Sequence, residues 1–138
     1  MNAPQGPGPI LALELLPGAF SVCRLEPDLP FPPWALAPGP LCSVTRTPEE
    51  WSVVCPSGRV PEGVRQEGGW RALKVQGPLP FEAVGILAAL SSTLAAAGVS
   101  LFAVSTYDTD YLLVKESRME TALGALRHAG HAIHLPRE

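Results

Sequence analysis

The sequence predicts an α+β fold, and two observations support this class. Fifteen of the 16 prolines lie at or before Pro80, and only Pro136 follows them. Because proline fixes φ and lacks a backbone donor, it disfavours long helices in the first half of the chain. After Pro80, alanine and leucine recur at helical spacing in two segments that alternate with strand-like ones. We therefore expect a helix-poor, strand-rich first half and a mixed second half.

The first half begins with two short strands. Residues 10–16 are apolar apart from one glutamate and are closed by a proline-glycine turn, and residues 21–25 form the second strand. The proline-rich segment 27–40 is expected to be extended or to form a single turn. Its aromatic residues, Phe31 and Trp34, are expected to attach it to the core.

Two further strands are expected around a short helical turn. Residues 41–46 and 51–55 alternate in the manner of strands. Between them, Thr47-Pro48-Glu49-Glu50 has the signature of a helix start, with threonine as N-cap, proline at the first position and glutamate at the third. The pattern predicts one helical turn between two antiparallel strands.

The second half predicts a strand, a helix, two strands, a helix and a strand, which is the ferredoxin-like βαββαβ order. The expected ranges are 71–76, 81–97, 99–106, 111–114, 117–130 and 131–135. The strand at 99–106 is nearly all apolar, so we expect it to be central in the sheet.

This pattern divides the chain into a tail and two subdomains. Residues 1–9 are expected to be a disordered tail. Residues 10–66 form a helix-poor subdomain and residues 70–135 a complete βαββαβ unit. Because either half alone would bury little apolar surface, we expect both to share one sheet and to pack as one body.

Composition excludes several classes of protein. The net charge of −3 argues against nucleic-acid binding, which normally requires a basic surface. No apolar run is long enough to cross a bilayer, so we expect no membrane partner. Three cysteines without a C-x-x-C spacing fit a reducing compartment, which predicts a cytoplasmic protein.

The sequence offers little for catalysis, metal binding or cofactor binding. His128, His131 and His134 recur every third residue, but a glycine interrupts the helix between the first two. The cysteines lie in apolar strands without a neighbouring base, as inert buried thiols do. Because no nucleophile, phosphate-loop or metalloprotease motif is present, we expect neither enzyme activity nor a bound metal or cofactor.

The polar cluster Ser105-Thr106-Tyr107-Asp108-Thr109-Asp110 follows the strand expected to be buried, and three interpretations are open. It can be a plain turn, since aspartate and threonine suit turns. Asp108 and Asp110 can bind a divalent cation through oxygen. The cluster can also hold the ammonium group of a small ligand whose carboxylate rests on the helix start near Gly85.

Two motifs carry a resemblance to a known family. One is Gly85-Ile86-Leu87 with the later Leu-Ala-Ala-Ala-Gly-Val ending, and the other is the string from Val104 to Val114. Together with Ser43 to Glu50, they resemble the ACT-domain family over roughly residues 10–135. The subgroup is the one that contains the animal cytosolic arginine sensors and their small bacterial relatives.

The resemblance implies two tandem ACT-like subdomains and a non-catalytic, amino-acid-binding regulatory or sensor module. It implies a free amino acid held between subdomains, a homodimer with sheets joined side by side, and a downstream protein that reads the bound state. Asp110 matches the position that pairs with a cationic ligand group. The implied ligand-binding residues are Pro80, Phe81, Gly85, Ile86, Ser100, Leu101, Thr106, Tyr107, Thr109 and Asp110.

Two other functions remain open beside the sensor. The sheet can serve as a structural dimerisation module without a ligand. A small acid/base enzyme is the other alternative, with Asp108 and Asp110 as its catalytic carboxylates.

Overall fold

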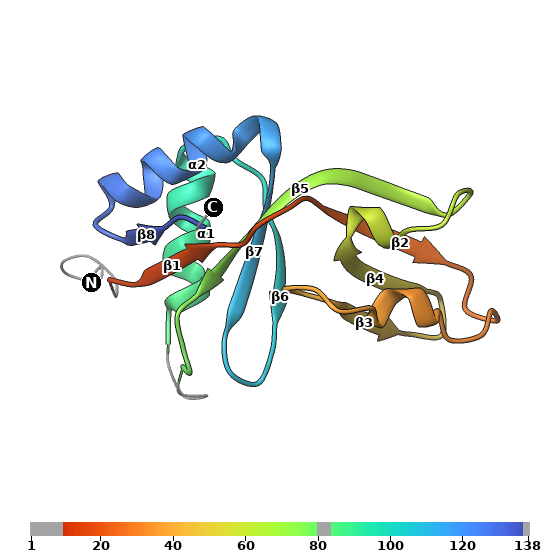
Figure 1. Cartoon of the computed structure of the whole chain (residues 1–138). Helices are drawn as coiled ribbons and strands as arrows, with labels where there is room; N and C mark the ends of the chain where they lie inside the picture. The colour runs from red at the N-terminus through yellow and green to blue at the C-terminus, as the bar shows by residue number, and fades with distance from the viewer. Residues whose placement is uncertain (1–9, 80–83, 137–138) are drawn as a thin grey trace.

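The computed structural model describes residues 10–79 and 84–136, which form eight strands and two α-helices (Figure 1). The tail expected at 1–9, and the candidate site residues Pro80 and Phe81, lie outside the described residues. The elements are β1 (Ala12–Leu15), β2 (Phe20–Leu25), the 3-10 turn η1 (Pro33–Leu36), β3 (Ser43–Arg46), β4 (Trp51–Pro56), η2 (Ser57–Arg59), β5 (Arg65–Val75), α1 (Ile86–Ala96), β6 (Phe102–Ser105), β7 (Asp110–Lys115), α2 (Glu116–His128) and β8 (Ala132–His134).

The long strand β5 connects the two halves of the molecule. Its first part pairs with β2, and its second part pairs with β1 on one edge and β7 on the other. At Leu73, for example, Leu15 lies on one side and Leu112 on the other. In Figure 1, β5 runs from the side of β2 and β4 to the side covered by the helices. The two halves therefore share one continuous eight-stranded sheet.

The C-terminal half is a two-layer structure in which α1 and α2 cover one face of the sheet. The strand order there is β6-β7-β5-β1-β8, with β8 parallel to β1. Inward side chains of β1, β5 and β7 form one buried cluster with both helices, which includes Leu73, Leu90, Leu112 and Leu126. The predicted α+β, ferredoxin-like fold is confirmed, with β1 of the N-terminal segment inserted between β5 and β8.

The other face of β5 and β7 packs against the N-terminal strands. Ala72 and Leu113 point to this side and contact a cluster around Phe20, Leu41 and Val54. This cluster binds the N-terminal strands to the C-terminal layer, so the two halves bury apolar surface against each other, as expected for short subdomains.

The proline-rich segment is attached to the sheet by its aromatic residues, as predicted. Phe31 meets the Trp51 ring edge-on at 5.8 Å, and the Trp51 indole N–H donates to the Leu29 carbonyl at 2.9 Å. Trp34 packs on the cluster formed by Cys23, Val53 and Cys55.

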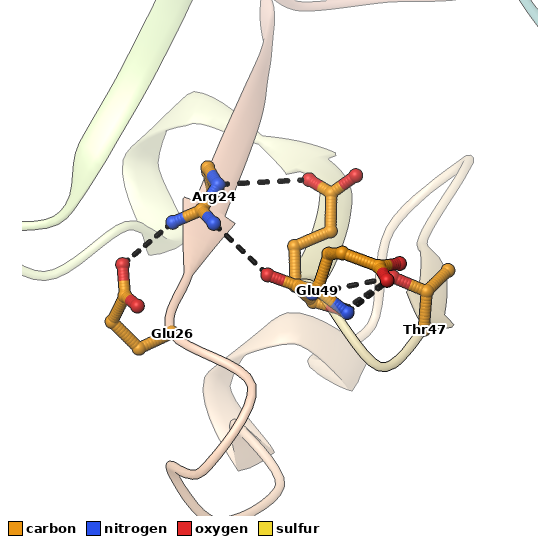
Figure 2. Close-up of polar contacts among 5 residues, drawn as sticks. Arg24, Glu26, Thr47 and Glu49 are labelled. Carbon is orange, nitrogen blue, oxygen red and sulfur yellow. Dashed lines mark hydrogen bonds and ion pairs between the residues drawn. The ribbon is translucent and has the colours of Figure 1, made fainter.

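The predicted helical turn at Thr47 is wrong, because this segment is the turn of the β3–β4 hairpin. Figure 2 shows Thr47 accepting the backbone N–H of Glu49, and it also accepts that of Glu50, at 3.1 and 3.2 Å. Arg24 of β2 donates to the Glu49 carbonyl at 2.9 Å and pairs with Glu26 at 2.7 Å. The threonine makes the bonds of an N-cap, but the chain turns back because β3 and β4 pair.

Three further expectations on the elements need correction. The strand expected at 71–76 starts earlier, at Arg65, because β2 provides a partner for its first part. The helix expected at 81–97 begins only at Ile86. Strand β6 is not central, since among the described residues it pairs with β7 alone. Phe102 and Val104 are partly buried by side-chain packing against the N-terminal strands rather than by a strand on each side.

His131 links β8 to the start of β1 and makes stability depend on pH. The Leu11 N–H donates to its Nδ1 at 3.0 Å, which requires an unprotonated nitrogen, and the side chain is 6% exposed. Burial lowers the pKa of His131 from its usual value, against a smaller opposing effect of the Leu11 hydrogen bond. The unfolded chain therefore binds a proton near pH 6.5 that the folded chain does not.

We expect the free energy of unfolding to be fully retained above about pH 6.5 and to fall as the pH drops through that value. Urea unfolding between pH 8 and 5 measures this. His131→Asn keeps an acceptor without a titrating ring and should flatten the slope, whereas the same change at exposed His128 should not. An unchanged slope in His131→Asn contradicts the assignment.

Candidate functional site

A cavity of about 360 Å³ lies between the start of α1 and the β6–β7 turn. Residues 85–88 form one wall, residues 105–110 form the other, and Leu79 also lines the cavity. The cavity is open to solvent, and Tyr107, 79% exposed, stands at its border. The start of α1 and the β6–β7 turn are separated in the sequence by the rest of α1 and by β6, and they meet at this cavity.

The wall at α1 is made of backbone. Gly85 has φ +83° and precedes the helix, whose first hydrogen bond runs from Ala89 N–H to the Gly85 carbonyl. The N–H groups of the first helical turn have no acceptor within the helix, and no side chain of residues 10–79 or 84–136 caps them. They give this wall the partial positive charge of a helix N-terminus. Because a Cβ on Gly85 would meet no atom within 4 Å, the backbone conformation, and not lack of space, explains the glycine.

The opposite wall carries negative charge. The Ser105 hydroxyl donates to Asp110 Oδ1 at 2.6 Å across the β6–β7 pair, which fixes that carboxylate. Thr106 and Thr109 close the turn, since the Thr106 N–H donates to the Thr109 carbonyl at 2.8 Å. With Asp108, two carboxylates border the cavity, and no lysine, arginine or histidine does so among the described residues.

Thr109 is oriented differently from its neighbours. Its side chain is 4% exposed, and its hydroxyl donates to the Val75 carbonyl at 2.6 Å, toward the end of β5. The hydroxyl proton is therefore engaged inside the protein.

The structure brings six of the ten candidate residues together at this cavity: Gly85, Ile86, Thr106, Tyr107, Thr109 and Asp110. Ser100 and Leu101 lie elsewhere, because they precede β6 and the cavity is at the far end of that strand. Leu101 packs on the core beneath the helices, and Ser100 is exposed. Sequence reasoning missed Ser105 as a partner of Asp110, although the antiparallel pairing of the two predicted strands would have placed them opposite each other.

The thiols do not form a reactive centre. Cys23, Cys42 and Cys55 come together around the N-terminal strands, and burial raises the pKa of each. For Cys55 the pKa rises to about 12, so the thiol stays protonated at neutral pH and is a poor nucleophile. Among residues 10–79 and 84–136, no three His, Cys, Asp or Glu side chains are grouped so as to hold a metal ion. Neither helix of this part of the chain could span a bilayer.

Comparison with known proteins identifies the family. The ACT-domain family model matches residues 65–128, and a model of an N-terminal domain matches residues 18–63. A protein of solved structure from Agrobacterium tumefaciens is 37% identical, with a TM-score of 0.88 over 95% of this chain and 97% of that chain. The chain belongs to the ACT-domain family.

One further relative and one protein of similar fold are more distant. The human cytosolic arginine sensor for mTORC1 subunit 1 is 36% identical over 59 residues, which are 42% of this chain. The match spans only 18% of the length of that sensor. The regulatory subunit of aspartate kinase from Thermus thermophilus shares the fold, with a TM-score of 0.62 and 14% identity over 88% of this chain and 99% of that chain.

Gly85 and Gly124 provide a matched test of the backbone wall. Gly85→Ala should destabilise the protein by about 1–2 kcal/mol, because alanine resists the left-handed conformation. Gly124→Ala, inside α2 with open space around its Cβ, should instead stabilise it by about 0.8–1.0 kcal/mol. Urea unfolding distinguishes the two signs. A Gly85→Ala variant as stable as the parent protein would show that φ is not positive there.

Proposed function

We propose that this chain binds a free amino acid in the cavity between α1 and the β6–β7 turn and acts as a regulatory module without catalysis. The observation that supports the proposal is the pairing of a positive backbone wall with a negative side-chain wall. An amino acid carries the complementary charges. Its carboxylate fits the free N–H groups at the start of α1, and its ammonium group fits Asp110.

The size and polarity of the cavity fit this ligand class. A volume of about 360 Å³ is near the lower end of small-molecule sites, roughly 300–1,000 Å³. Ile86 and Leu87 add apolar surface beside the charged groups. With Asp108 and Asp110 at the border, an acidic ligand side chain would be repelled, and a neutral or cationic one would not.

The relatives support a regulatory role. One is named as an arginine sensor and another as the regulatory subunit of an aspartate kinase. One name describes sensing and the other describes regulation of an enzyme. For this chain, a downstream protein that responds to the bound state belongs to the proposal.

We further propose a homodimer formed through β6. Edge strands are normally protected by charge, proline or short length. Strand β3 carries Arg46, and β8 has three residues and is followed by Pro136. Strand β6 has four residues and is also short, but its sequence Phe-Ala-Val-Ser contains neither a charged residue nor a proline. Pairing between two copies of β6 would bring the two cavities close together, since β6 ends at Ser105 beside the site.

The ligand proposal predicts a thermal shift with at least one of the twenty amino acids. A ligand at 100 times its dissociation constant adds about 2.7 kcal/mol of stability. Asp110→Asn should weaken binding at least about tenfold, because it removes a charged acceptor. Asp28→Asn, at an exposed site away from the cavity, is the control and should bind normally. The proposal fails if none of the twenty stabilises the protein.

The dimer proposal predicts that a charge on the free edge of β6 dissociates the protein. Ala103→Lys places a lysine at an exposed position of β6, and Ala132→Lys does the same on β8. Light scattering after size exclusion should give a dimer for the parent and for Ala132→Lys and a monomer for Ala103→Lys. A monomeric parent, or a dimer that survives Ala103→Lys, contradicts pairing through β6.

A further inference from the structure

The β6–β7 turn, which forms one wall of the cavity, is held to the chain that leaves β5 by three contacts. The Thr109 hydroxyl donates to the Val75 carbonyl at 2.6 Å, and the Leu79 N–H donates to the Asp108 carbonyl at 2.7 Å. The third contact is the close approach of Gly77 to Asp108 and Thr109. All three connect the chain that leaves β5 with the β6–β7 turn.

The Thr109 contact replaces a bond of the sheet. The pairing of β5 with β7 ends at Lys74 and Tyr111, so Val75 is just past the last pair. Its carbonyl would be left without a strand partner there, and the Thr109 hydroxyl supplies the donor. Since the side chain is 4% exposed, water cannot easily take this place.

Gly77 permits the same approach by having no side chain. A Cβ there would lie 3.0 Å from the Asp108 carbonyl oxygen and 3.2 Å from the Thr109 Cβ. The first neighbour is a backbone atom, which cannot rotate away. The chain after β5 therefore lies directly on the turn, and this places Leu79 at the cavity.

We propose that Thr109 is a positioning residue that holds Leu79 at the cavity, against the β6–β7 turn, rather than a group that contacts the ligand. Its only hydroxyl proton is directed to Val75, away from the cavity. Loss of this bond frees the chain after β5 to move off the turn, and Leu79 moves with it. Ligand affinity then falls although every group at the ligand remains, a consequence that rests on the proposed amino-acid site.

The test uses four variants of the full chain. Thr109→Val removes the hydroxyl and keeps the shape, and Thr109→Ser keeps the hydroxyl. Gly77→Ala forces the same two segments apart while Thr109 is intact. Thr93→Val is the matched control, because the Thr93 hydroxyl also donates to a backbone carbonyl, that of Ala89 at 3.0 Å, but lies outside the cavity.

Hydrogen exchange at the Leu79 amide in the ligand-free protein is the first measurement. We expect Thr109→Val and Gly77→Ala to exchange about tenfold faster or more, as loss of one buried hydrogen bond implies. Thr109→Ser and Thr93→Val should stay near the parent. Unchanged exchange in Thr109→Val, failure of Thr109→Ser to restore protection, or equal acceleration in Thr93→Val each overturns the proposal.

Calorimetric titration with L-arginine and with L-lysine, at a temperature where every variant is folded, is the second measurement. Thr109→Val should bind about tenfold more weakly and Thr109→Ser about as well as the parent. Equal affinity of Thr109→Val and the parent overturns the positioning role. If the parent binds neither amino acid and none of the twenty gives a thermal shift, the proposed function fails, and the exchange measurement alone decides whether Thr109 holds Leu79 in place.

Discussion

The fold depends on the pairing of β5 along both of its edges. One edge receives β2 and then β1, and the other receives β7. Because backbone groups in a sheet must be paired, this strand fixes where each half of the molecule begins. The helices then cover one face of β5 and β7, and the N-terminal strands pack on the other. The two-layer C-terminal half and the strands β2, β3 and β4 are thus held in one body.

The candidate site follows from where β5 and its neighbours end. The chain leaves β5 at Val75, and β7 begins at Asp110, so the segments that follow and precede these strands meet at one edge. One segment leads to the free N–H groups of α1, and the other contains the aspartates. The opposite charges of the two walls result from a helix start and a tight turn. The charge of neither wall requires a catalytic group to explain it.

Much of the fold could be predicted because local pattern and tertiary structure agree. The helical spacing around Leu90 and Leu94 predicts α1, and both residues are fully buried. The predictions are wrong where pairing with another strand determines the structure of a segment. Thr47 has the chemistry of a helix start, yet the pairing of β3 with β4 makes it a turn. Phe102 and Val104 of the apolar strand β6 pack on side chains of the N-terminal half and are partly buried, so the apolar sequence does not mean a central position.

The sequence alone determined the class of fold, the helix stripes, the family motifs and the polar cluster from Ser105 to Asp110. These are local properties, set by side-chain period and turn chemistry. Tertiary structure decided that β1 lies between β5 and β8, that Ser105 fixes Asp110, and that the Thr109 hydroxyl is directed to Val75. Each of these positions follows only when the strands have paired, and the contacts of β1 with β8 and of Thr109 with Val75 join residues far apart in the chain.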